Sequence, residues 1–165
     1  MQKTRVVVAA LLVASALNLA LMVPGGFVET RDFSAYPFLV LGAFNVFLTV
    51  LGLGSIMLAY VVIKAGKGYR WSALAGVAFI AVYLLDLGGI FPVPPNPMST
   101  LLATLEWIGT ALGLALATAS LLLPRRATAN AAPSATPSWP RPVMVGLGLL
   151  ALIIVAFATK SAMGV

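Results

Sequence analysis

The stretch PFLVLGAFNVFLTVLGLGSIMLAYVVI, residues 37–63, decides the fold. It contains no charged side chain, and it is longer than the roughly 20 apolar residues that a helix needs to cross a bilayer core. A strand of a membrane barrel would instead be short and would alternate polar and apolar residues. The stretch therefore predicts a membrane-spanning helix.

Further apolar runs predict the remaining spans, and each of them is bounded by proline, glycine or charged residues. With residues 37–63, the predicted spans are residues 6–23, 71–91, 99–123 and 143–159. Hydrophobic residues make up 61% of the chain and charged residues 8%, a composition that would leave a soluble domain with extensive exposed apolar surface. The lipid bilayer is the expected surrounding. The sequence thus predicts an all-α integral membrane protein with five transmembrane helices.

The predicted organisation is an antiparallel four-helix transmembrane bundle plus a fifth, tethered transmembrane helix. Residues 1–123 form the predicted bundle. Residues 124–142 are rich in proline and alanine and predict a cytoplasmic linker without a core of its own. Residues 143–165 then carry the fifth helix and a short outer tail.

The basic residues alternate with the predicted spans. Eight of them fall on one side: Lys3, Arg5, Lys64, Lys67, Arg70, Arg125, Arg126 and Arg141. Only Arg31 and Lys160 fall on the other. By the positive-inside rule the N-terminus is cytoplasmic and the C-terminus extracytoplasmic, and the compact loops favour the cytoplasmic (inner) membrane of a prokaryote. Lys3 and Arg5 before an apolar run also fit a cleaved signal peptide, which would leave the orientation of the other spans unchanged.

The composition also excludes several functions. The chain has no cysteine and no histidine, so the usual ligands of haem, iron–sulfur clusters and structural zinc are missing, and we expect no cofactor, no metal and no thiol chemistry. No nucleophile is paired with a base, so no catalytic residue is predicted. The net charge of +6 is explained by topology, and no nucleic-acid partner is expected.

The four carboxylates lie toward the predicted outer side, and two of them fall within spans. Glu29 and Asp32 belong to the first outer loop, where water can solvate them. Asp86 and Glu106 each lie on the order of 10 Å inside a predicted boundary. Ionisable groups in spans usually face the bundle interior and are often functional.

Uncharged polar residues occur at the same predicted depth. Asn18 and Asn45 fall at the level of the two buried acids, and Tyr83 lies one turn before Asp86. These residues are candidates for a ligand- or ion-binding site. The alternative interpretation is structural, because amides and carboxylates near a boundary also bind headgroups or hold helices together.

Arg31 is the remaining candidate for this site. It either pairs with its loop neighbours Glu29 or Asp32, or folds down over Asp86 and Glu106. The second outer loop, FPVPPNP at residues 91–97, is stiff and uncharged. Both loops are placed to cover a site at this depth.

Three functional hypotheses follow. The first is a non-enzymatic accessory, assembly or interaction subunit that contacts other membrane proteins through the fifth helix or the outer loops. The second is a small transporter or an ion- or proton-coupled binding protein that uses the polar cluster. The third is an enzyme that acts on lipids.

Overall fold

A computed structural model describes residues 2–123 and 140–164. Within these residues the fold is all-α, without strands, and its five helices are α1 (Gln2–Leu21), α2 (Phe38–Ala65), α3 (Tyr69–Leu87), α4 (Thr100–Leu122) and α5 (Arg141–Ala162). All five are long and apolar enough to span a membrane. The predicted fold class is confirmed. The linker predicted at residues 124–142 lies almost wholly outside the described residues.

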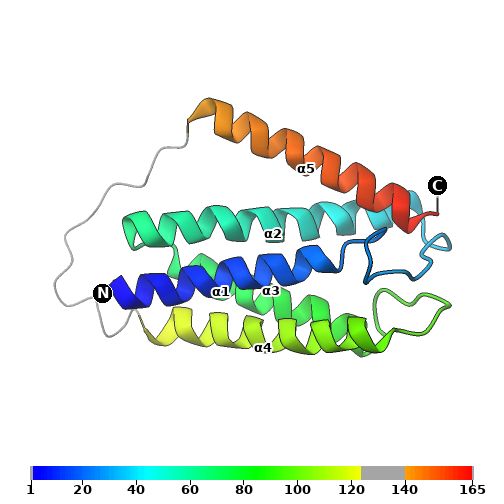
Figure 1. Cartoon of the computed structure of the whole chain (residues 1–165), viewed down its shortest axis with the longest axis horizontal. Helices are drawn as coiled ribbons and strands as arrows, with labels where there is room; N and C mark the ends of the chain where they lie inside the picture. Colours follow the sequence, from blue (N-terminus) through cyan, green and yellow to red (C-terminus); the bar gives the residue numbers. More distant parts are fainter. Residues whose placement is uncertain (1, 124–139, 165) are drawn as a thin grey trace.

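The first four helices pack into an antiparallel bundle (Figure 1). α1 packs against α2 and α4, α3 packs closely on α4, and α2 and α3 make fewer contacts. A single apolar core runs between them and includes Val8, Leu12, Phe79 and Leu116, which are fully buried. The bundle therefore has one loose side, between α2 and α3.

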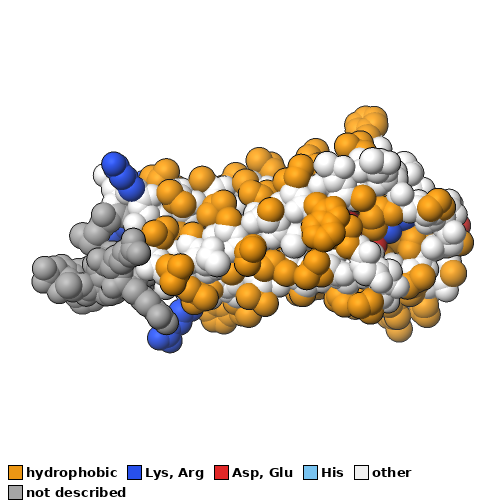
Figure 2. All heavy atoms as spheres, turned by 90° about the horizontal axis from the view of Figure 1, so that it is seen from below, with side chains coloured by type: hydrophobic (Ala, Val, Ile, Leu, Met, Phe, Trp, Pro, Cys, Tyr) orange, Lys and Arg blue, Asp and Glu red, His pale blue; other side chains and the backbone are white. Residues whose placement is uncertain are grey.

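The two ends of the bundle differ in charge. We call the end with the loops after α1 and α3 the acidic end, because all four carboxylates lie toward it, and the opposite end the basic end. Figure 1 has the acidic end at the right, with the C-terminus, and the basic end at the left, with the N-terminus. Hydrophobic side chains cover the face between the ends (Figure 2), as lipid contact requires.

The helix ends differ from the predicted ones where glycine or proline acts. α3 ends at Leu87, four residues before the predicted Phe91, because Gly88 and Gly89 follow and Gly89 has a φ of 61°. Asp86 consequently lies in the last turn of its helix rather than a turn and a half inside it. α5 begins earlier than predicted, at Arg141, because Pro142 fits the first turn of a helix.

α5 is attached to the bundle mainly at the acidic end. Its buried residues are Ala158, Thr159 and Ala162, all in its last two turns. The backbone N–H of Phe33 donates to the carbonyl of Ala162 at 3.1 Å, and Phe33 packs with Leu41 and Ala162. Toward the basic end α5 diverges from α2 (Figure 1). α5 is thus held to the bundle by its C-terminal end and packs less closely along the rest of its length.

The close packing of α3 on α4 depends on glycine. A Cβ at position 76 would lie 2.7 Å from the carbonyl oxygen of Gly113 and 2.8 Å from the amide nitrogen of Ala117. Both are backbone atoms and cannot rotate away, so the helices would have to separate. We expect Gly76→Ala to lower the free energy of unfolding by about 1–3 kcal/mol, measured by thermal unfolding in detergent.

The matched control is Gly42→Ala on α2, where a Cβ would meet nothing within 4 Å. This variant should unfold at the same temperature as the wild type or at a slightly higher one, because alanine favours the helix more than glycine does. Equal losses in the two variants would contradict the close-packing argument.

Candidate functional site

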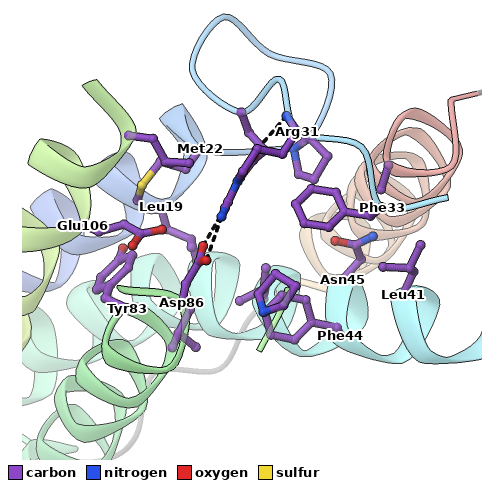
Figure 3. Close-up of a pocket in the computed structure, with 17 residues that line it drawn as sticks. Leu19, Met22, Arg31, Phe33, Leu41, Phe44, Asn45, Tyr83, Asp86 and Glu106 are labelled. Atoms are coloured by element: carbon purple, nitrogen blue, oxygen red, sulfur yellow. Dashed lines mark hydrogen bonds and ion pairs between the residues drawn. The ribbon is translucent and has the colours of Figure 1, made fainter. Parts of the chain in front are cut away.

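The centre of the site is Arg31, which the loop after α1 folds into the acidic end of the bundle. Its Nη1 and Nη2 donate to Oδ1 and Oδ2 of Asp86 at 2.8 and 2.6 Å. Its Nε and Nη2 also donate to Oε1 and Oε2 of Glu29 at 2.9 and 2.6 Å. The guanidinium is therefore held in bidentate pairs by a loop carboxylate and a helix carboxylate at once (Figure 3).

This cluster is buried. The side chains of Arg31, Glu29 and Asp86 are 5%, 6% and 12% exposed. The ring of Phe33 lies 5.4 Å from the guanidinium carbon and covers it. Desolvation lowers the pKa of Arg31, but hydrogen bonds to Asp86 and Glu29 outweigh it and raise the pKa above its ordinary value. Arg31 stays charged throughout the neutral pH range.

Glu106 extends the cluster from α4. It is only 3% exposed, and its carboxyl group points toward Asp86 and the hydroxyl of Tyr83 (Figure 3). Its Oε2 is buried and has no hydrogen-bond partner among the described residues. A buried acceptor without a partner is costly, so a ligand that donates a hydrogen bond to this atom would be favourable.

The two asparagines are placed differently. Asn18 donates to the hydroxyl of Tyr83 at 3.3 Å and to the carbonyl of Leu105 at 3.1 Å, so it orients Tyr83 beside Glu106. Asn45 donates to the hydroxyl of Thr159 on α5 at 3.0 Å. Asn45 lines the same cavity as the acids but is bonded to the fifth helix rather than to them.

A cavity of about 60 Å³ joins these residues, enough for water molecules or a small ligand. Its polar wall consists of Glu29, Arg31, Asn45, Tyr83, Asp86 and Glu106. Apolar side chains complete it, with Leu19 from α1, Met22 from the segment directly after α1, and Phe44 and Leu48 from α2. A few converging polar groups in an apolar enclosure are typical of a small-molecule site.

The loop between α3 and α4 helps to close this end. The backbone N–H of Val93 donates to the hydroxyl of Tyr36 at 2.8 Å. Phe91 makes edge-to-face contacts with Tyr36 and with Phe44 of α2, at centroid distances of 5.6 and 5.0 Å. The two loops therefore contact each other above the cavity, as two covering loops would.

The interpretation of Glu29 as a solvated loop residue is wrong. Glu29 is 6% exposed and is a direct partner of Arg31. The spacing of two residues between Glu29 and Arg31 indicates that the two side chains can pair. It does not indicate whether the pair is exposed to solvent or buried. Asp32 remains exposed; its carboxylate accepts from the backbone N–H of Ser34 at 2.8 Å, and this bond lowers the pKa of Asp32.

Comparison with known families adds one result. Residues 4–134 match the family described as a domain of unknown function (DUF8051). The chain belongs to this family. The matched DUF8051 region contains α1–α4, and with them every charged residue of the cavity wall, whereas α5 lies outside it. No curated protein and no solved structure is matched.

Proposed function

We propose that this small polytopic membrane protein binds a positively charged ligand in the cavity at its acidic end, and that it does so without catalysing a reaction. The supporting observation is the charge of the enclosure. Glu29, Asp86 and Glu106 carry three carboxyl groups against the single guanidinium of Arg31. An enclosed surplus of negative charge is unfavourable next to lipid. A cation or a proton that enters this site offsets the surplus.

The chemistry of the walls favours an organic cation over a metal ion. The described residues contain no group of three acidic or other metal-ligating side chains placed to hold a metal, and Arg31 already occupies both oxygens of Asp86. A protonated amine needs only one or two acceptors and tolerates apolar neighbours. We propose that the protonated amine donates a hydrogen bond to the unpartnered Oε2 of Glu106.

A binding screen tests the proposal. Detergent-purified protein is heated with NaCl, KCl, ethylamine or neutral ethanol, and a ligand that binds the folded state raises the Tm. We expect ethylamine to raise the Tm and ethanol to leave it unchanged. Glu106→Gln should remove the response, because it replaces the carboxyl group, and with it one acceptor oxygen, with an amide.

The control is Asp32→Asn, which replaces a carboxylate with an amide at an exposed position in the loop after α1. This variant should respond to ethylamine like the wild type. A response that persists in Glu106→Gln, or the lack of any response in the wild type, would contradict the proposed site. An accessory or assembly role would then be the better proposal, because α5 exposes Val145, Leu149, Leu152 and Ile153 to whatever surrounds it.

A further inference from the structure

A second cavity adjoins the polar one. It has a volume of about 120 Å³ and lies between α1, α2 and α5. Leu19, Met22, Pro24, Asn45 and Leu48 line both cavities. The two spaces are thus neighbours that share one wall, and we call the second one the apolar annex.

The annex differs from the polar cavity in chemistry. Its walls are Ala16, Ala20, Val23, Gly52, Leu53, Ile56, Ile154 and Ala158 besides the shared residues, with Thr49 and Asn45 as its polar members. It contains no charged side chain. Of the two neighbouring cavities, the one with Glu106 is therefore the charged one, and the annex matches a hydrocarbon chain.

The annex also lies where membrane lipid has access. Ile154 and Ala158 contribute its α5 side, and α5 is joined to the bundle just beyond them, through Thr159 and Ala162. On the basic side of that junction α5 diverges from α2 (Figure 1). Leu152 and Ile153, next to Ile154 on α5, are exposed, so an apolar chain in the annex would lie beside a helix face that contacts the bilayer.

We propose that the ligand is an amphiphile, with a primary ammonium group bound at Glu106 and an apolar chain in the annex. This inference rests on the proposed cation site and names its ligand class. The charge surplus and the unpartnered Oε2 of Glu106 select the ammonium group. The shared wall places the apolar chain of the same molecule next to it. An aminophospholipid and a free alkylamine have this chemistry in common.

Gly52 offers a way to fill the annex from a position that does not itself line the polar cavity. A Cβ at position 52 would make an ordinary contact, 3.7 Å from Cδ2 of Leu19, so Gly52→Leu places its side chain into the annex. Gly54, two residues further along the same helix, lines no part of the annex, and a Cβ there would meet nothing within 4 Å. Gly54→Leu is the matched control, and the smaller Gly52→Ala is kept in case Gly52→Leu folds poorly.

The experiment compares octylamine, ethylamine and octanol by thermal shift in detergent, and nanodiscs of phosphatidylcholine with and without phosphatidylethanolamine. Octylamine also partitions into micelles, but this partition is the same for every variant at one detergent concentration. We expect Gly52→Leu to weaken the apparent affinity for octylamine roughly tenfold and to leave that for ethylamine unchanged, with a smaller loss in Gly52→Ala. Gly54→Leu should behave like the wild type, and octanol should shift none of them.

The outcomes separate the two proposals. If ethylamine binds and octylamine binds equally well to Gly52→Leu and wild type, the annex inference is overturned and the cation site stands. If no amine binds, the cation site itself is overturned. Stabilisation by phosphatidylethanolamine that Gly52→Leu removes supports a membrane lipid as the source. A Gly52-dependent shift with octylamine alone supports a free amine.

Discussion

Arg31→Ala is expected to lower the free energy of unfolding by about 3–5 kcal/mol, the largest loss that we expect from any exchange in the loops. The reason is the charge left behind rather than the bonds removed. Glu29 and Asp86 are 6% and 12% exposed and would be left buried without their cationic partner. The loop of residues 22–37 would also lose its anchor to α3. Thermal unfolding in detergent measures the effect.

Two further exchanges test this explanation. Arg31→Lys keeps the positive charge but loses the planar fork that holds both carboxylates, so its loss should be intermediate. Lys160→Ala removes the other basic residue at this end, which is exposed, and should change the stability by less than about 0.5 kcal/mol. If Arg31→Ala unfolds like Lys160→Ala, the cluster is not what holds the loop.

The sign of the pH dependence follows from the pKa of Arg31. That pKa is raised in the folded chain, so the contribution of Arg31 is complete below the ordinary pKa of arginine. It is lost only as the pH rises through the raised value. Titration of Arg31 therefore does not affect stability near neutral pH. The difference between wild type and Arg31→Ala should stay constant when neutral buffers are made moderately alkaline.

The helices could be predicted because each span carries its own signal. Residues 37–63 need no knowledge of any neighbour to be recognised, and α2 occupies Phe38–Ala65. The helix ends were predicted less well, because proline and glycine act through backbone geometry. The pair Gly88-Gly89 ended α3 early and moved Asp86 into the last turn.

The site could be predicted only in part, because counting residues gives depth but not direction. Asn18 and Asn45 fall at similar depths, yet one faces Tyr83 and the other faces Thr159 on α5. The rotation of each helix about its axis depends on packing across the whole bundle. Nothing local to Asn45 indicates α5 as its neighbour.

The loop shows the same limit. Arg31 and its possible partners could be named from the sequence, but choosing between Glu29 and Asp86 was not possible, and the structure uses both. A loop has no periodicity from which to infer its path. Whether Glu29 is buried depends on that path, and for this reason the sequence predicted a solvated Glu29.

Asp86→Asn and Glu106→Gln should differ clearly in their effects on the unliganded protein, although both remove one buried acid. Asp86 accepts two short hydrogen bonds from Arg31, so its amide leaves a nitrogen facing the guanidinium and one charge of the cluster unbalanced. We expect Asp86→Asn to lower the free energy of unfolding by about 2–4 kcal/mol. Its thermal unfolding should therefore resemble that of Arg31→Ala more than that of the wild type.

The free energy of unfolding of Glu106→Gln should lie within about 1 kcal/mol of the wild-type value, or above it. Its Oε2 has no partner to lose, and the exchange removes one acid from a cavity that has three carboxyl groups and one guanidinium. A residue that binds a ligand is often unfavourable for the empty protein, and replacing it often stabilises the fold while removing the function.

The contrast separates a binding residue from structural glue. If Glu106 merely holds α4 to its neighbours, Glu106→Gln should cost as much as Asp86→Asn, since both acids are buried. A loss above about 2 kcal/mol in Glu106→Gln would therefore assign it to the fold rather than to a ligand. An unchanged or raised Tm together with a lost ethylamine response is the pattern that only the binding role predicts.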